Sequence, residues 1–108
     1  MATSINLNEA RSQPMPERGI LSQTLLKNEF TSLVHMKLAP GEELTEHTSK
    51  FPVWIYTIEG EGSLETPSGS YPMSEGEWIF LEPSEEHAVQ PKSQLHFLLI
   101  MMKTGGAK

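Results

Sequence analysis

The chain has 108 residues, the size of one ordinary domain, and 37% of them are hydrophobic, enough for one modest core without disulfide or metal staples. Its formal charge of −6 is spread along the sequence, and the eight Lys and Arg residues form no cluster that could follow a phosphate backbone. Nucleic acid is therefore not expected as a partner. The absence of cysteine excludes a disulfide framework, thiolate catalysis and a zinc-finger site.

The N-terminal segment, residues 1–18, is polar and shows neither a helical nor a two-residue period. It lacks the apolar region of a signal peptide, and the longest apolar run of the chain, 97–102, is too short to span a bilayer. We therefore expect a soluble, cytoplasmic protein without a membrane partner. Residues 1–18 are predicted to form an arm, either mobile or ordered by packing, for instance in a dimer.

From Gly19 onward, short runs of β-branched, aromatic and aliphatic residues alternate with turns rich in Gly, Pro, Asn and Ser. The predicted strands cover 20–26, 30–39, 53–59, 62–66, 77–82, 87–90 and 94–102. No segment has the period of an amphipathic helix of ten or more residues. This pattern is typical of an all-β sandwich or barrel built from hairpins, and we expect one such domain over residues 19–108.

Two of the predicted strands, 78–81 and 97–102, are apolar on both faces. A strand that lines a barrel needs only one apolar face, so something must cover the other. The N-terminal arm, a second sheet or another protomer could do so. A two-layer core and a homodimer that uses the outer face of the sheet both remain open.

Two of the four histidines are expected to be structural. In "SLVHMKL", the residues at 34, 36 and 38 are all apolar and are predicted to face the core, which leaves His35 beside Lys37 on the outer face. His96 lies in a strand that is apolar on both sides, so periodicity does not decide its direction. We interpret His96 first as a packed, hydrogen-bonded residue and second as a pocket residue.

The other two histidines each follow a turn at a defined spacing. His47 lies six residues after Gly41 and thirteen before Gly60, and His87 lies eleven residues after Gly76. With these spacings residues 30–102 resemble the cupin superfamily, although Glu and a shifted Pro replace the Asp and Pro of its second motif. The resemblance implies a small, single-domain, RmlC-like cupin with a double-stranded β-helix, or jelly-roll, barrel.

The resemblance also implies where a metal would bind, and here the chain departs from the pattern. Metal-dependent cupins hold an ion with two histidines and a glutamate of the first motif and a histidine of the second. In this chain Ser49 and Val53 occupy two of these four positions, which leaves His47 and His87. These two could hold one divalent transition metal (Fe, Mn, Ni, Cu or Zn) weakly, or the protein could lack a metal.

Without a metal, the same positions form a candidate small-molecule pocket. Its predicted lining is Thr45, His47, Ser49, Val53, Ile55 and His87, with Trp54 or Trp78 as a further wall. Glu82, Glu85 and Glu86, in the turn before His87, are expected to form a solvated loop.

Three functions remain open from the sequence. The first is a small-molecule-binding protein with a weakly bound metal or none. The second is a mononuclear metal-dependent enzyme, dioxygenase-like or isomerase-like. The third is a non-catalytic dimeric interaction module whose barrel is a filled core. Whether the protein is an enzyme is not decided by the sequence.

Overall fold

The structure is a computed structural model of the whole chain that describes residues 2–12, 14 and 18–103, except for the side chains of Glu46 and His47. The described elements are α1 (Leu7–Arg11), β1 (Ile20–Lys27), β2 (Thr31–Leu38), β3 (Leu44–His47), β4 (Val53–Glu59), β5 (Glu61–Thr66), β6 (Gly69–Ser74), β7 (Trp78–Leu81), β8 (His87–Pro91) and β9 (Leu95–Met102). The expected all-β architecture is therefore confirmed.

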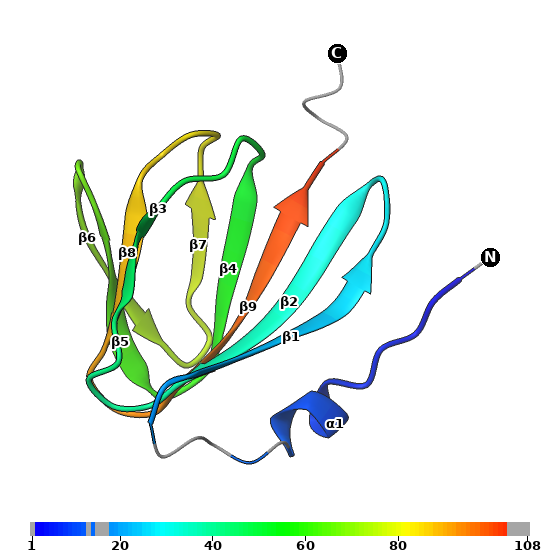
Figure 1. Cartoon of the computed structure of the whole chain (residues 1–108), viewed down its shortest axis with the longest axis horizontal. Helices are drawn as coiled ribbons and strands as arrows, with labels where there is room; N and C mark the ends of the chain where they lie inside the picture. The colour runs from blue at the N-terminus through cyan, green and yellow to red at the C-terminus, as the bar shows by residue number, and fades with distance from the viewer. Residues whose placement is uncertain (1, 13, 15–17, 104–108) are drawn as a thin grey trace.

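The strands form two antiparallel sheets that face each other (Figure 1). The first has five strands in the order β1-β2-β9-β4-β7, and the second has four in the order β3-β8-β5-β6. Neighbours such as β2 and β9 are distant in sequence, as the predicted jelly-roll requires. Two facing sheets place the core between them, so each strand has an inner and an outer face.

Strand β2 shows how the alternation of residues produces this arrangement. Met36 and Leu38 are buried between the sheets, where their positions are paired with Phe97 and Leu95 of β9. His35, before Met36, and Lys37, between Met36 and Leu38, point to the opposite face, as predicted. The buried core cluster consists of Met36, Leu38, Val53, Ile55, Leu64, Met73, Leu81, Val89, Leu95 and Phe97.

Two strands lie outside the predicted hydrophobic runs. Strand β3 is short, and β6 carries Pro72 and buries only Met73 among its residues. Strand β6 is an edge of its sheet, which is where a proline is tolerated because one row of backbone N–H groups needs no partner strand. Neither strand therefore has the apolar pattern that identifies a strand in sequence.

Within the predicted N-terminal arm, α1 lies against the outer side of the five-stranded sheet (Figure 1). The side chain of Asn6 accepts a hydrogen bond from the Asn8 amide at the start of the helix, and Ala10 is 4% exposed. At the end of the helix, Nζ of Lys37 donates to the carbonyl oxygen of Arg11 at 3.1 Å. No helix among the described residues is long and apolar enough to cross a membrane.

Candidate functional site

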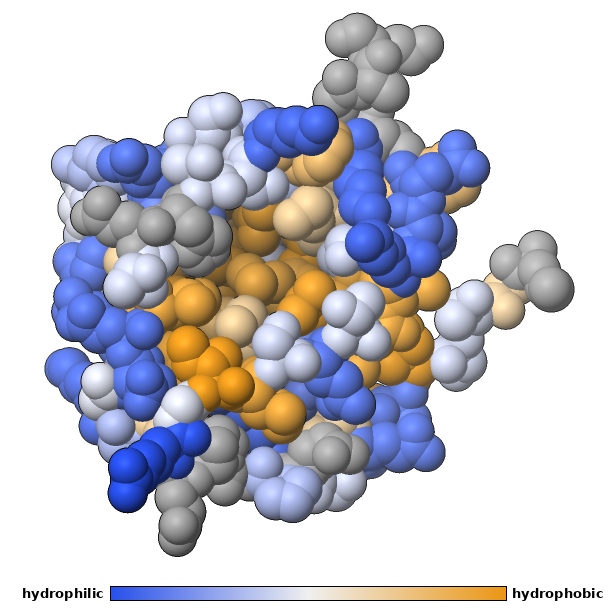
Figure 2. Space-filling view, in the orientation of Figure 1, coloured by the Kyte–Doolittle hydropathy of each residue, from blue (hydrophilic) through white to orange (hydrophobic). Residues whose placement is uncertain are grey.

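The space between the two sheets contains a small cavity of about 80 Å³. It is lined by Ser32, Val34, Ser49, Val53, His87, Leu99 and Met101. Figure 2 shows an apolar hollow at the centre of the face seen in Figure 1, with hydrophilic side chains around its border. An apolar concavity with a few polar groups is the usual form of a small-molecule site.

Among the described residues that line this cavity, His87 is the only titratable one. It lies at the start of β8 and is 3% exposed. Its Nδ1 lies 3.1 Å from the carbonyl oxygen of Glu85, which can only accept, so the ring donates from Nδ1. The neutral imidazole then carries its lone pair on Nε2.

The six predicted pocket residues are only partly brought together. Ser49 and Val53 line the cavity with His87, whereas Ile55 is fully buried in the core cluster and Thr45 is exposed on β3. The side chain of His47 lies outside the described part of the chain. Its backbone is paired directly with His87 in the ladder between β3 and β8.

The expectation that Trp54 or Trp78 forms a wall of this pocket is wrong. Trp54 lies between Val53 and Ile55, which both face the core, so its own side chain projects from the opposite face of β4. There it contacts Trp78 and Phe80 of β7, with ring centroids 5.9 and 5.0 Å apart respectively. All three rings are more than a third exposed.

The described side chains do not form a metal site. Among them, no group of three or more His, Cys, Asp or Glu residues is placed to hold an ion. The positions of Ser49 and Val53 supply a hydroxyl and an aliphatic group beside His87. The acidic turn does not complete a site, because Glu82 and Glu86 are exposed, as expected for a solvated loop.

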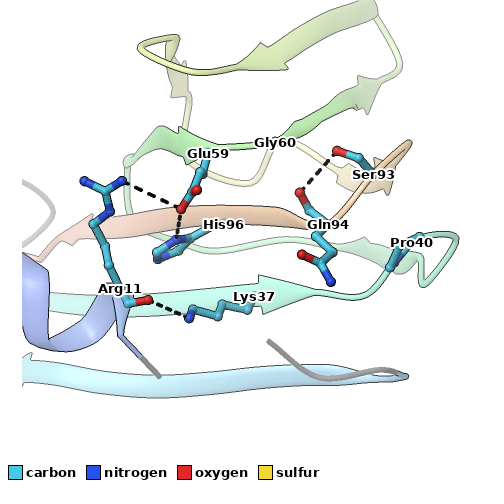
Figure 3. Close-up of a pocket in the computed structure, with 8 residues that line it drawn as sticks. All are labelled: Arg11, Lys37, Pro40, Glu59, Gly60, Ser93, Gln94 and His96. Carbon is cyan, nitrogen blue, oxygen red and sulfur yellow. Dashed lines mark hydrogen bonds and ion pairs between the residues drawn. The ribbon is translucent and has the colours of Figure 1, made fainter. Parts of the chain in front are cut away.

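A second and larger cavity, of about 680 Å³, lies on the outer face of the five-stranded sheet near α1 (Figure 3). It is lined by Arg11, Lys37, Pro40, Glu59, Gly60, Ser93, Gln94 and His96. We refer to it as the outer cavity. Of these residues, the sequence suggested only His96 as a pocket residue, and only as its second interpretation.

The outer cavity is a concentration of charged and titratable groups. The Glu59 carboxylate has two partners. It lies 3.8 Å from the Arg11 guanidinium and 3.5 Å from Nδ1 of His96 (Figure 3). Behind His96, the ring of His35 packs against it. His35, Lys37 and His96 are each at most 3% exposed.

Burial shifts the titration of these groups. Desolvation, together with the nearby His96 and Lys37, lowers the pKa of His35 from 6.5 to about 4. Burial also lowers the pKa of His96, although its hydrogen bond to Glu59 opposes the shift. The pKa of Lys37 is lowered by burial too, with Glu59 acting in the opposite direction.

A partial signal for this cluster exists in the sequence. Alternation along β2 predicts that His35 and Lys37 share the outer face, and the structure confirms it. The register that pairs Lys37 with His96, and His96 with Glu59 across a bulge in β4, links residues far apart in the chain. Periodicity within one strand cannot supply that link.

Comparison with solved structures shows that the fold is widespread. The chain is similar to a cupin superfamily protein from Desulfitobacterium hafniense, with 17% identity, a TM-score of 0.83 and 94% of each chain covered. It is also similar to an RmlC-like cupin from Desulfovibrio desulfuricans, with 20% identity, a TM-score of 0.83 and coverage of 95% of this chain and 98% of that one. A predicted oxalate decarboxylase from Thermotoga maritima shares 24% identity over 78% of this chain and 80% of its own, with a TM-score of 0.69.

These identities establish the fold and not an activity. No curated protein matches the sequence. The family model of the cupin domain matches residues 34–101, well over half of the chain and including both predicted motifs. The chain therefore belongs to the cupin family.

Proposed function

We propose that this cupin binds a small, largely apolar molecule in the barrel cavity, with His87 as its main polar contact. The main support for this proposal is the cavity between the sheets, where four aliphatic or thioether side chains lie beside His87 and two serines. A volume of about 80 Å³ holds only a few non-hydrogen atoms. The ligand would therefore insert one small group, while the rest lies in the apolar hollow of Figure 2.

The polar groups limit what this inserted group can be. Since Nδ1 of His87 donates to Glu85, its Nε2 is suited to accept from a hydroxyl or amine of the ligand. The hydroxyl of Ser49 is a bond acceptor for the amide of Phe51 at 3.1 Å, and can donate in turn. Small carbonyl, sugar and aromatic compounds with a hydroxyl are the classes to screen.

The test is a thermal-shift screen of these classes, followed by calorimetry on tag-free protein. A ligand should raise the melting temperature and lose most of its affinity in His87→Leu, which keeps bulk but removes both ring nitrogens. Thr45→Val is the matched control, since Thr45 is exposed on the same sheet. Binding that is unchanged in His87→Leu would contradict the proposal, as would a several-degree fall in the melting temperature on adding a chelator.

The second candidate is a metal-dependent enzyme, and the register favours it in one respect. His47 and His87 occupy directly opposed positions of neighbouring strands, a spacing at which two imidazoles can share an ion. Because Ser49 and Val53 replace the other ligands, waters or substrate would complete the shell and affinity would be low. A bound metal would supply Lewis acidity to a dioxygenase-like or isomerase-like reaction.

Elemental analysis of tag-free protein tests this candidate. If the protein is such an enzyme, we expect a substoichiometric content of transition metal. This content should rise on reconstitution and be lost in His47→Ala and His87→Ala. Failure to take up Fe, Mn, Ni, Cu or Zn on reconstitution would rule it out.

We also propose that the protein is a homodimer that pairs the outer faces of β4 and β7. Trp54, Tyr56, Trp78 and Phe80 form a continuous set of contacting rings there, which we call the aromatic patch. Trp78 is 53% and Phe80 42% exposed. A patch without charged side chains, rich in flat rings, suits a two-fold interface, because the same surface can cover itself. In a non-catalytic interaction module, this patch would be the functional surface.

A further inference from the structure

We propose that the ligand of the barrel cavity is an aliphatic carboxylate with a hydroxyl at its other end, and that Lys27 of β1 binds the carboxylate. This inference rests on the proposed function, which places the hydroxyl end beside His87. It adds the second end of the ligand, the chemistry of the body between the two ends, and a binding residue that the sequence did not single out.

The barrel cavity is open on the side of β1 and β2. Val34, Leu99 and Met101 line it and are only partly buried, whereas Met36 and Phe97, on the same face of the same strands, belong to the buried core. Figure 2 shows that the apolar hollow is open to the outside. A ligand larger than the cavity of about 80 Å³ can therefore extend from it along the sheet.

The register of the sheet shows which residues such a ligand meets next. Val34 is paired with Thr24 of β1, and Ser32, which also lines the cavity, is paired with Lys27. Paired residues of antiparallel strands project from the same face, with Cβ atoms about 4.5–5.5 Å apart. A register shift between Thr24 and Leu26 inserts one extra residue, so Lys27 shares the inner face with Thr24 although the two are three positions apart.

The inner face of β1 is exposed. The first sheet has five strands and the second has four, and the inner-face residues Ser22, Thr24 and Lys27 of β1 are all exposed. Thr24 and Lys27 therefore border the hollow on this side, one strand spacing of about 4.8 Å from the residues that line the cavity.

Lys27 gives this border its charge. On the inner face of β1, β2 and β9 it is the only charged residue, since the other positions carry aliphatic, aromatic, thioether or hydroxyl side chains. It is a cation in a protein with a formal charge of −6. The hydroxyls of Thr24 and Ser32 add O–H donors beside its ammonium. One cation with neutral donors suits a monoanion, and a carboxylate is the monoanion that an organic ligand most simply supplies.

The body of the ligand should be aliphatic and extended. The apolar walls of the cavity are Val34, Val53, Leu99 and Met101, and no aromatic side chain lies among the described lining, so a ring would find no stacking partner. Strands β1 and β4 are three strand spacings apart, roughly 14 Å, and side chains project into this span from both ends. An alkyl chain of about eight carbons, roughly 10 Å long, matches what remains.

The test is isothermal titration calorimetry on the full chain without a tag, at low ionic strength. The probes are 8-hydroxyoctanoate, octane-1,8-diol, which lacks the charge, and octanoate, which lacks the hydroxyl. We expect 8-hydroxyoctanoate to bind about fivefold more tightly than the diol, the effect of a partly exposed ion pair. Octanoate should bind more weakly than 8-hydroxyoctanoate because it loses the contact with His87. This preference for the acid over the diol should shrink as salt is added.

Three variants locate the carboxylate end. Lys27→Met should abolish the preference for 8-hydroxyoctanoate and leave the affinity for the diol nearly unchanged. Lys27→Glu should reverse it, so that 8-aminooctan-1-ol binds more tightly than 8-hydroxyoctanoate. Lys92→Met is the matched control, because it makes the same charge change at an exposed position in the turn before β9. Lys27 and Lys92 are both exposed, so all three variants should fold.

The outcomes separate this inference from the proposed function. Equal affinities of wild type for 8-hydroxyoctanoate and the diol would overturn the inference alone, as would a preference that persists in Lys27→Met or is lost equally in Lys92→Met. The barrel function would then stand, provided that His87→Leu weakens binding of the diol. Equal binding of the diol by wild type and His87→Leu would instead refute the proposed function, and with it the placement of the hydroxyl end. If no probe binds wild type, both are wrong.

Discussion

His35 and His96 lie against each other on the outer face of the five-stranded sheet, with ring centroids 4.2 Å apart and ring planes at 72°. Their Nε2 atoms are hydrogen-bonded partners, so one must donate and the other accept. Nδ1 of His96 lies 3.5 Å from the Glu59 carboxylate, a position that favours a proton there. The neutral ring of His96 thus carries its proton on Nδ1 and accepts at Nε2, and His35 donates from its own Nε2.

This pair makes the stability of the fold depend on pH. The folded-state pKa of His35 is lowered from 6.5 to about 4, and that of His96 is also lowered, so between these pH values the unfolded chain binds more protons than the folded one. Stability should therefore be lost as pH falls from about 6.5 to about 4, by roughly 3 kcal/mol for a shift like that of His35. Lys37, Arg11 and Glu59 face the pair, and the two cations add to the cost of protonation.

Urea unfolding at closely spaced pH values between 4 and 7.5 measures this dependence. The double variant His35→Gln/His96→Gln should show a clearly flatter profile in the same interval. An equally steep profile in the double variant would assign the effect to carboxylates instead.

Gly60 should be much less replaceable than Gly41, although both have a positive φ, of +92° and +78°. A Cβ at Gly60 would lie 1.8 Å from the carbonyl oxygen of Gln94, whereas one at Gly41 would have nothing within 4 Å. Gly60→Ala combines a clash against backbone with an unfavourable φ and should cost about 3 kcal/mol or more, against about 1 kcal/mol for Gly41→Ala. Chemical denaturation of both variants measures the difference, and similar values would contradict the close approach of β4 to the turn before β9.

Trp78→Glu should convert the proposed dimer into a monomer. It places a charge on the most exposed ring of the aromatic patch, and a desolvated, unpaired charge in an interface is strongly unfavourable. Sedimentation velocity of wild type and variant at matched concentrations measures the change. Phe30→Glu is the control, because Phe30 is 58% exposed in the turn between β1 and β2, outside the patch. A monomeric wild type would refute the dimer, and a dimeric Trp78→Glu would move its interface elsewhere.

Much of the fold was predictable because it depends on local patterns. The alternation of Val34, Met36 and Leu38 predicts which face of β2 is buried, and glycines at fixed distances from His47 and His87 carry the resemblance to cupins. The strands without such a pattern were the ones missed. Strand β6 lies at a sheet edge and buries only Met73 among its residues, so its packing does not require alternating apolar residues.

The candidate sites divide in the same way. Residue spacing and alternation alone predicted the jelly-roll barrel, the placement of His35 and Lys37 on its outer face, and the replacement of two metal-ligand positions by Ser49 and Val53. The contacts of those outer residues, in contrast, depend on how distant strands pair. Pairing of β2 with β9 and of β9 with β4 brings Lys37, His96 and Glu59 side by side, and α1 adds Arg11. Strand register between distant segments is set by the packing of the whole core, and no period within a single strand encodes it.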